Sequence, residues 1–429
     1  MEHYRNIDKC RVCNSENLVQ VLKLNDQYIG TTFVKSNDTH PMSKIKIPLT
    51  LIRCEDCTLV QLKETTNPEL LYRDYYYRTS INDTMKKDLR NVVDCAIKKV
   101  NQIFDIGDCV IDIGANDMTM IQMFPDYLNR IGVEPAKNID WSNVDKSVCI
   151  VNDYFSKEVV EKHSKAMKGK KAKIITCCAC FYDMDDPNKV VEDMKDLLDK
   201  NGVIVIQVSH LLATLKDMNW YDICEEHLEY YSLESLDNLL EKHDLRIFDA
   251  ETNFVNGGSL RVYVCHKGCE FHMWKYRTVR FHLILEEERK YKINNLQTFK
   301  DFENNIQKVS SKIYNYIFDE VQKGNLVLGL GASTKGNKLL QICGIGKELI
   351  PFISDRSRIK IGLFTLGTNI ELISEEVARH LNPSMFFVLP WNFKEEIVER
   401  EKEYIQNGGK LLFAIPFPYF LDQEGEHIL

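Results

Sequence analysis

One stretch of the chain, between residues 109 and 135, constrains the fold more than any other. Its apolar, β-branched start at 110–113 is typical of a buried parallel strand. Gly114 then permits a tight turn, and the apolar spacing of 118–124 predicts a helix. A second strand is expected at 130–133. These features together predict a βαβ unit in an open α/β sheet.

The two ends of this unit carry groups suited to a nucleoside. Glu134 follows Asp112 by 22 residues, and a carboxylate at the tip of a second strand can accept both ribose hydroxyls. A helix after Gly114, with Asn116 and Asp117 as turn or N-cap formers, would offer unpaired N–H groups to a polar ligand. A dinucleotide is disfavoured because its pyrophosphate needs three glycines in the turn. The alternative is a structural βαβ unit that binds nothing.

Four of the fourteen cysteines form two matched C-x-x-C pairs near the N-terminus, Cys10 with Cys13 and Cys54 with Cys57. Each pair can present two thiolates to one tetrahedral ion, which predicts a Zn²⁺ site. Four thiolates leave no open position for water or substrate, so the site is interpreted as structural. The segment between the pairs must fold back as strands, and 46–53 is the expected one. Four separate core cysteines are the alternative.

Length and charge set limits on the class of protein. A chain of 429 residues predicts two or three domains, and its net charge of −8 argues against a broad nucleic-acid surface. The sequence contains no run of about 18 apolar residues, so no membrane span is predicted. The N-terminus lacks the apolar region of a secretory signal, so the cysteines are expected to be reduced and the location cytoplasmic.

Two polar stretches are candidates for chemistry. Tyr75, Tyr76 and Tyr77 bring apolar area and hydroxyl groups, which suits either a substrate pocket or packing between domains. Glu226 and His227 are adjacent, and imidazole beside a carboxylate is a common apparatus for proton transfer near neutral pH. A surface position for this histidine is the alternative, since neighbouring residues do not face each other on a helix.

The remaining chain continues the α/β pattern. Strands at 173–178 and 202–208 flank a helix at 190–199, and the loop 181–187 lies at the carboxyl edge where open sheets bind ligands. Gly257 and Gly258 suit a hairpin or a close backbone approach. Residues 270–322 are expected to form long charged helices that connect two domains. The sequence thus predicts a doubly wound sheet followed by a connector.

The last third repeats the opening pattern of strand, glycine turn, helix and acidic strand end. Ser333 and Lys335 in the turn 331–336 add a hydroxyl donor and positive charge suited to a diphosphate, and Asp355 is placed like Glu134. The expected strands are at 326–329, 349–354, 385–389 and 410–415, with helices at 337–342 and 394–405. A second Rossmann-like domain is therefore predicted, with a purely structural unit as the alternative.

The ordered motifs resemble those of the sugar-nucleotide C-methyltransferases, bacterial-type enzymes that act on 4-keto deoxysugars. The resemblance covers nearly the whole chain, and D-I-G-A-N-D looks like the S-adenosylmethionine loop of class I methyltransferases. After the two C-x-x-C pairs, the motifs are D-I-G-x-N-D at 112–117, E-H-L-x-Y-Y-S at 226–232, N-G-G-S-L-R-V-Y at 256–263, G-A-S-T-K-G-N at 331–337, D-R-S-x-x-K-x-G at 355–362 and P-W-N-F at 390–393.

The resemblance implies three domains and two cofactors, S-adenosylmethionine and Zn²⁺. A zinc domain at 1–72 would partly cover the active site, a methyltransferase domain at 73–268 would bind S-adenosylmethionine, and a Rossmann-like domain at 269–429 would help hold a dTDP- or UDP-linked sugar. Such an enzyme would need neither nucleic acid nor membrane, and would be a monomer or a small homo-oligomer.

The resemblance also assigns roles to residues. The expected catalytic residues are His227 as the base, Glu226 and Tyr77. Those expected to bind the cofactor are Asp112, Gly114, Asn116, Asp117 and Glu134. Those expected to bind the substrate are Tyr75, Asn256, Ser259, Arg261, Ser333, Lys335, Asn337 and Asp355. The chemistry would remove a proton α to a ketone, stabilise the enolate and transfer a methyl group to carbon.

Four positions depart from the family pattern. Met118 stands where glycine is usual, and its side chain is expected to crowd the cofactor loop. Glu225 replaces a common histidine, while Cys224 and Asp183 replace a tyrosine and a histidine that could steady an enolate. These departures motivate an alternative, a catalytically lapsed nucleotide-sugar-binding protein. An NAD-dependent oxidoreductase is disfavoured because the C-terminal turn lacks the third glycine and carries Lys335.

Overall fold

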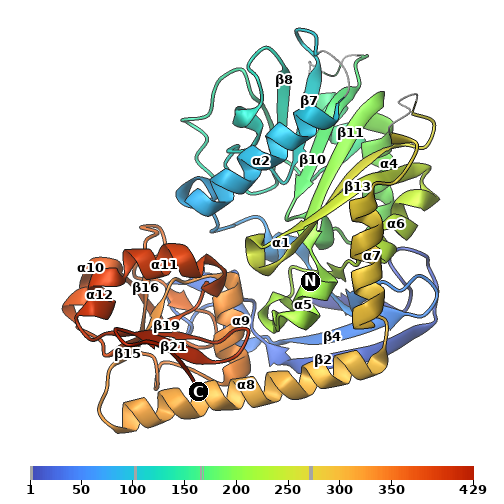
Figure 1. Ribbon diagram of the computed structural model, residues 1–429. Coiled ribbons are helices and arrows are strands. Elements are labelled where there is room, and N and C mark those ends of the chain that lie inside the picture. The colour runs from blue at the N-terminus through green and yellow to red at the C-terminus, as the bar shows by residue number, and fades with distance from the viewer. Residues whose placement is uncertain (1–2, 101–103, 165–166, 168, 270–273) are drawn as a thin grey trace.

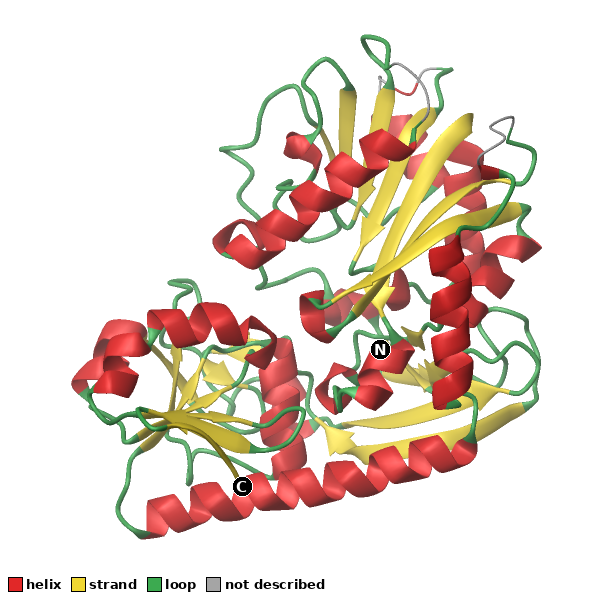
Figure 2. Cartoon of the chain, viewed as in Figure 1, coloured by secondary structure: helices red, strands yellow, loops and turns green. Residues whose placement is uncertain are grey.

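The computed structural model describes residues 3–100, 104–164, 167, 169–269 and 274–429, which form three lobes (Figure 1). A central lobe stands above an N-terminal sheet, and a C-terminal lobe lies beside them. A long helix, α8 (Leu296–Gln322), runs beneath both the N-terminal sheet and the C-terminal lobe. The predicted α/β class is confirmed, because helices cover the sheets of the central and C-terminal lobes (Figure 2).

The central sheet has seven strands in the order β13-β14-β11-β10-β7-β8-β9. Strands β11, β10, β7, β8 and β9 are parallel to one another, whereas β14 is antiparallel to both β11 and the edge strand β13. The strands are β7 (Cys109–Ile113), β8 (Asn129–Val133), β9 (Cys149–Val151), β10 (Ala172–Cys178), β11 (Leu198–Ser209), β13 (Leu245–Asn253) and β14 (Ser259–His266). The helices of this lobe are α2 (Asp83–Lys99), α3 (Lys157–His163), α4 (Pro187–Leu197), α5 (Leu211–Lys216) and α6 (Leu233–Lys242).

Alternate residues of the parallel strands belong to two different cores. Val110 and Ile174 pack with apolar residues of α2, whereas Ile111 and Ile175 pack with those of α4 and α6. Because successive strand side chains point to opposite faces, both faces of the sheet are buried under helices. The doubly wound sheet that the sequence predicts is therefore confirmed.

The helix predicted at 118–124 is wrong. Only a short 3₁₀ turn, η3 (Ile121–Met123), occurs between β7 and β8. Asn116 and Met118 have φ values of 49° and 63°, in the left-handed region that an α-helix excludes. The apolar residues of this stretch are nevertheless buried against α2, so their spacing reflects a packed loop.

The N-terminal region forms an antiparallel sheet, β12-β5-β4-β2, to which the central lobe contributes β12. The strand expected at 46–53 is confirmed as β4. The elements are β1 (Tyr4–Asn6), β2 (Leu18–Gln27), β3 (Phe33–Val34), β4 (Ile47–Cys54), β5 (Val60–Leu62), β6 (Glu64–Thr66), α1 (Pro68–Leu71) and β12 (Glu229–Tyr230). The N-terminal region in turn contributes β3 to the edge of the C-terminal sheet, so each of these two sheets joins two lobes.

The C-terminal sheet has nine strands in the order β22-β21-β20-β19-β15-β16-β18-β17-β3, parallel from β20 to β18. Its own strands are β15 (Val327–Leu330), β16 (Phe352–Asp355), β17 (Phe364–Thr365), β18 (Glu371–Ser374), β19 (Met385–Val388), β20 (Lys410–Phe413), β21 (Tyr419–Asp422) and β22 (Gly425–Ile428). The helices are α9 (Thr334–Cys343), α10 (Glu375–His380), α11 (Lys394–Arg400) and α12 (Lys402–Gln406). The second Rossmann-like fold predicted from the sequence is confirmed.

Two helices, α7 (Val279–Tyr291) and α8, connect the central and C-terminal lobes, as the charged stretch predicts. The expected start of this connector, 270–273, lies outside the described residues. Within the described ranges, no helix combines the length and apolar character needed to cross a membrane.

Candidate functional site

The four predicted zinc ligands come together at one end of the N-terminal sheet. Their Sγ atoms all lie within 4.8 Å of one another, and the Cys10–Cys57 and Cys13–Cys54 pairs are each 3.5 Å apart. Four sulfurs at about 2.3 Å from a tetrahedral ion would be roughly 3.8 Å apart. The donor set therefore fits Zn²⁺, whose role with four thiolates is structural.

The two cysteine knuckles have matching backbone geometry. Asn14 N–H donates to the Cys10 carbonyl at 2.9 Å, and Thr58 N–H donates to the Cys54 carbonyl at 3.0 Å. Asn14 and Thr58 both have left-handed φ, 61° and 65°, which turns each chain back after its second cysteine. The C-x-x-C spacing thus produces two equivalent turns that face one ion.

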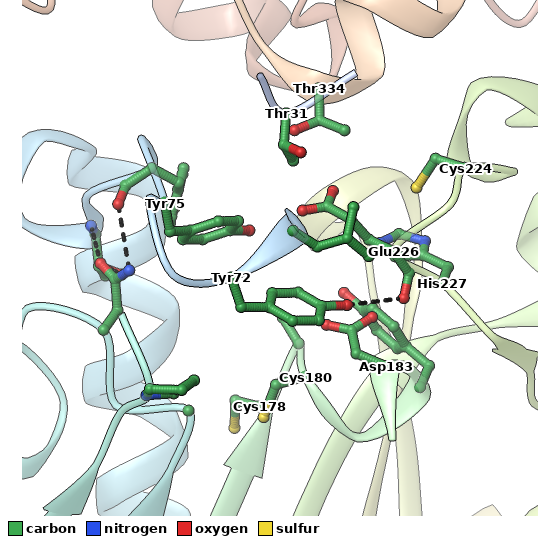
Figure 3. A pocket seen from close by; sticks show the side chains of 18 of the residues that line it. Thr31, Tyr72, Tyr75, Cys178, Cys180, Asp183, Cys224, Glu226, His227 and Thr334 are labelled. Carbon is green, nitrogen blue, oxygen red and sulfur yellow. Dashed lines mark hydrogen bonds between the residues drawn. The ribbon is translucent and has the colours of Figure 1, made fainter. Parts of the chain in front are cut away.

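A cavity of about 500 Å³ lies between the three lobes. This volume falls in the range of roughly 300–1,000 Å³ that is usual for small-molecule sites. The N-terminal region contributes Thr31, the central lobe contributes Gly114 and Glu226, and the C-terminal lobe contributes Thr334 and Lys335. Figure 3 shows Thr31 and Thr334 on one side of the cavity and Asp183 and Cys180 on the other.

One end of the cavity is formed by the glycine turn after β7. Gly114 has φ of 69°, and a Cβ atom there would lie 2.7 Å from the Cys180 Sγ. The buried Asp112 carboxylate accepts a hydrogen bond from the Thr176 hydroxyl at 2.8 Å. Burial raises the pKa of Asp112 to about 7. This end of the cavity carries a buried acidic group and lacks a glycine-rich loop of the kind that binds a pyrophosphate. It therefore fits a nucleoside cofactor without phosphates.

Glu134 lines the same end and is tied to the turn. Its Oε2 accepts the Asn116 N–H at 2.9 Å, and its Oε1 accepts the Ala136 N–H at 2.8 Å. Each carboxylate oxygen can accept a further hydrogen bond, so both remain available to a ribose. The predicted N–H donors of a helix after Gly114 are absent, since the Gly114 and Ala115 N–H groups donate to the Val133 carbonyl.

Asn116 and Asp117 mainly hold neighbouring backbone. The Asn116 Oδ1 accepts the Thr79 N–H at 3.1 Å, and the Asp117 Oδ2 accepts the Ser80 N–H at 2.8 Å. Asn116 lines the cavity, whereas Asp117 does not. Tyr77 lies at this end too, and its carbonyl accepts from the Asn116 Nδ2.

The expectation that Met118 crowds the cofactor loop is wrong. Its side chain is fully buried in the core beneath the turn and does not line the cavity. It occupies the space above Gly132, where an added Cβ would collide with the Met118 sulfur. The methionine side chain therefore fits because Gly132 has no side chain of its own.

Met118→Gly is consequently expected to destabilise the protein without tightening cofactor binding. Loss of a buried methionine side chain costs about 2–5 kcal/mol, partly offset because glycine adopts the left-handed backbone at little cost. Chemical denaturation and calorimetric titration with S-adenosylmethionine measure the two effects. Tighter binding by the variant would restore the crowding interpretation.

The other end of the cavity holds the Glu226 and His227 pair, both buried. The Tyr72 hydroxyl donates to the Glu226 carbonyl at 3.1 Å, and the His227 ring packs on Tyr182 with centroids 4.3 Å apart. Burial, and then the charge of Lys335, lowers the pKa of His227 to about 3. Burial, and then the charge of Glu225, raises the pKa of Glu226 to about 8. The surface alternative for this histidine is therefore excluded.

The C-terminal lobe brings three lysines to this region. Lys335 pairs with Asp222 and donates to the Asn256 carbonyl at 3.1 Å, whereas Lys338 pairs with Glu225 in full burial. Lys360, which also lines the cavity, donates to the Ala332 carbonyl at 2.7 Å. Three of the predicted substrate ligands, Ser333, Lys335 and Asn256, line the cavity as well. Ser333 is the N-cap of α9, since its Oγ accepts the Gly336 N–H at 3.0 Å.

Four predicted substrate residues form the supporting structure and do not line the cavity. Arg261 is 1% exposed and donates to Gln207, Asn91 and Asp88, each at 2.7 Å. The remaining three bond backbone groups: Ser259 donates to the Val255 carbonyl, Asn337 donates to the Gly30 carbonyl, and Asp355 accepts from Ala332 and Ser357. Tyr75 does line the cavity, near Glu226 (Figure 3).

Some cavity residues escaped the sequence analysis. Tyr72 precedes the tyrosine cluster and lies in a loop without periodicity, while Thr31 and Phe33 belong to the zinc region and reach the cavity only through the lobe arrangement. In the sequence, Asp183 stands out only as a departure from the family pattern. Its position at the carboxyl edge of the sheet, in η5 (Phe181–Asp183), is the signal that identifies it.

Comparison with known proteins places the three lobes in families. Family profiles match a zinc binding domain at 10–72, a methyltransferase domain at 83–250 and a C-methyltransferase C-terminal domain at 254–416. Among solved structures, an S-adenosylmethionine-dependent methyltransferase from Clostridium acetobutylicum matches at 14% identity and a TM-score of 0.32, covering 42% of this chain and 92% of that one. Magnesium protoporphyrin IX methyltransferase from Synechocystis matches at 11% identity and a TM-score of 0.32, over 44% and 90%.

A full-length relative settles the family. The C-methyltransferase NovU of Streptomyces niveus is 30% identical over 421 residues, which is 98% of each chain. The Cys₄ cluster and the methyltransferase lobe accompany this similarity. The chain therefore belongs to the family of S-adenosylmethionine-dependent, zinc-binding C-methyltransferases.

Proposed function

We propose that the protein transfers a methyl group to a carbon atom next to the ketone of a nucleotide-linked 4-keto deoxysugar. The observation that carries the proposal is the single cavity in which the Gly114 turn, the Glu226–His227 pair and the Lys335 turn meet. The cavity thus offers three things side by side: a site for a nucleoside cofactor, a proton-transfer pair, and a helix start that carries positive charge.

S-adenosylmethionine supplies an electrophilic methyl group when it is bound. Its ribose is assigned to Glu134 and its methionine end to the turn at Gly114, with Asp112, Asn116 and Asp117 shaping that turn. Its place at one end leaves the Glu226–His227 end to the sugar. Tyr75 and Asn256, which line the same cavity, are assigned as sugar contacts, and Tyr77 is assigned to the cofactor end.

The diphosphate of a dTDP or UDP sugar is assigned to the start of α9. Ser333 and Lys335 lie at that helix start, where N–H groups and the helix dipole favour an anion. Lys335 pairs with Asp222 and would have to be shared with, or released to, the phosphate. Asn337 and Asp355 hold the turn, and Ser259 and Arg261 hold the strand behind Asn256, so their contribution is indirect.

His227 is assigned the removal of the α-proton. Its low pKa keeps the imidazole neutral throughout the physiological range, with a ring nitrogen able to accept a proton. An ionised Glu226 beside it would stabilise the imidazolium that forms. The chain's own groups thus generate a carbon nucleophile facing the cofactor end.

The test is direct assay with S-adenosylmethionine and a panel of dTDP- and UDP-linked 4-keto deoxysugars. Mass spectrometry should find methylated product, and α-proton exchange in D₂O should occur even before methyl transfer. Binding without exchange or methylation across the panel would support the lapsed-binder alternative. As part of the proposal, we assign the protein to a reducing cytoplasm, where cysteine thiols stay reduced.

Glu134→Ala is expected to weaken S-adenosylmethionine binding by roughly 1.5–3 kcal/mol, the value for losing charge-assisted hydrogen bonds. Part of the loss would come from the Asn116 and Ala136 N–H groups that the carboxylate holds. Isothermal calorimetry measures the change. Glu192→Gln, at an exposed position of α4, serves as a control. Equal affinity of Glu134→Ala and the unmutated protein would remove the ribose assignment.

A further inference from the structure

Asp183 lies beside the proposed base at the sugar end of the cavity. It is the last residue of η5, the short turn that follows Cys180. The Leu228 N–H donates to the Tyr182 carbonyl at 2.8 Å, which joins η5 to the segment that carries Glu226 and His227. Figure 3 shows the Asp183 carboxyl beside the Tyr72 ring, with Glu226 and His227 above it in this view.

The Asp183 carboxyl has no partner among the described residues. Its Oδ1 is enclosed and makes no hydrogen bond, and neither an ion pair nor a side-chain hydrogen bond reaches the group. The nearest lysines of the C-terminal lobe are already paired, Lys335 with Asp222 and Lys338 with Glu225. Asp183 therefore differs from Asp222 and Glu225, which are paired with these lysines, and from Glu134, whose carboxylate accepts two backbone N–H groups.

An unpaired carboxylate in such surroundings is costly, so the group retains its proton. Burial, and then the negative charge of Glu226, raises the pKa of Asp183 well above its usual range. The titratable groups around it are the neutral imidazole of His227 and a set of acids: Glu226, Glu229, Cys180, Tyr72, Tyr75 and Tyr182. When Glu226 ionises, its charge holds the proton on Asp183, as in other interacting carboxyl pairs.

We propose that Asp183 is a catalytic residue that donates its carboxyl proton in a hydrogen bond to the enolate oxygen of the sugar. The inference rests on the proposed function. The carbonyl carbon is bonded directly to the carbon that loses its proton, so the oxygen must lie beside the base. Asp183 is a carboxyl at that place whose O–H is taken by no acceptor among the described residues, and such a donor aimed at a developing oxyanion lowers the barrier.

The proton balance is simple. The base takes the α-proton, the C–H electron pair moves into the enolate, and the Asp183 hydroxyl donates to the oxygen without transferring its proton. The new carbon–carbon bond would form with that electron pair as the methyl–sulfur bond of a bound sulfonium cofactor breaks, with its electrons left on sulfur, and the ketone would be restored. Asp183 is then unchanged, and the proton on the base leaves to solvent.

Two tyrosines, and Glu226 while it is protonated, are competing donors. The Tyr72 hydroxyl is occupied by the Glu226 carbonyl at 3.1 Å. The Tyr75 hydroxyl points toward Glu226 across the same space (Figure 3). A variant of Tyr75 is therefore needed beside the variants of Asp183.

The kinetic experiment compares Asp183→Ala, Asp183→Asn and Tyr75→Phe, with Glu192→Gln as an exposed carboxyl-to-amide control. Asp183→Ala should lose roughly 10²–10³-fold in α-proton exchange and methylation, the effect of removing one oxyanion donor. Asp183→Asn keeps an N–H donor and should lie closer to the unmutated rate. The unmutated rate should fall as pH rises through the Asp183 pKa, and the asparagine variant should lack this fall.

A measurement without substrate isolates the protonation state. Difference infrared spectroscopy at neutral pH should show a protonated carboxyl band that is lost in Asp183→Asn and retained in Glu192→Gln. A spectrum without such a band, or one that Asp183→Asn leaves unaltered, would overturn the proposal. Kinetics would overturn it if the alanine variant were fully active, if asparagine were as damaging as alanine, or if Tyr75→Phe alone abolished exchange.

Failure of the proposed function gives a different pattern. A protein that shows the Asp183 band but turns over no keto sugar nucleotide would overturn the substrate assignment and, with it, the donor role. A protein that turns over the sugar but lacks the band would overturn only the donor role. Equal damage by asparagine and alanine would instead indicate that Asp183 acts as a carboxylate toward a cationic substituent.

Discussion

Replacing His227 by alanine is expected to lower methylation by roughly 10²–10⁴-fold, the usual contribution of a positioned proton-transfer group. The ring is buried against Tyr182, at the end of the cavity away from the cofactor turn. Binding of S-adenosylmethionine should therefore survive the substitution. The decisive measurement is α-proton exchange in D₂O on a 4-keto sugar nucleotide, followed beside methyl transfer.

The pH dependence gives this prediction a second readout. His227 is neutral above a pKa of about 3, so its own titration should not appear in the working range. Glu226, with a pKa of about 8, is mostly protonated at neutral pH and ionises as pH rises. If the carboxylate supports the imidazolium, the rate should increase through about pH 8, and Glu226→Gln should abolish this increase.

A matched control is available on α7, where His282 is exposed. His282→Ala should leave exchange and methylation unaltered. Unaltered exchange in His227→Ala would assign the base to another residue, and Glu226, whose carboxylate is a stronger base than this imidazole, would be the first to examine.

The sequence predicts the sheets well because buried parallel strands require long apolar runs. Val110 and Ile111 face different cores, so both had to be apolar. It fails after Gly114 because apolar side chains there pack as a loop. Met118 and Phe124 are buried beneath α2 although no helix forms, and burial alone does not distinguish the two structures.

The site is predicted less completely because its chemistry depends on contacts between distant segments. Arg261 carries a motif position, yet its charge is used by Asp88 in α2, 173 residues earlier. Lys338 and Glu225 likewise form a buried pair across two lobes. Local patterns indicate Glu134 and His227, whereas the partner of a charged group is set by tertiary structure.

Loss of the zinc centre is expected to affect the whole protein, although no cysteine of the cluster lines the cavity. Structural Zn²⁺ contributes about 10–16 kcal/mol of apparent binding energy in small domains. Cys13→Ser or Cys57→Ser should therefore reduce the metal content from one ion per chain and lower the midpoint of unfolding. Elemental analysis and thermal denaturation measure both, with Cys95→Ser on α2 as the control.

The same variants should lose exchange activity because the zinc centre supports the catalytic segment. The strand β5 begins three residues after Cys57 and pairs with β12, where Tyr230 lies opposite Val60. Strand β12 begins two residues after His227, and the Leu62 N–H donates to the carbonyl of the intervening Leu228 at 2.8 Å.

The turn at Gly114, to which we assign the cofactor, is held by β8 and not by the zinc sheet. Its Gly114 and Ala115 N–H groups donate to the Val133 carbonyl of β8. Partial loss of zinc should consequently reduce α-proton exchange before it reduces S-adenosylmethionine affinity. Measuring both along a chelator titration tests this order. Freshly purified protein without metal, Cys57→Ser with full zinc content, or parallel loss of exchange and cofactor binding would each contradict a zinc centre that acts by holding β12 and the residues before it.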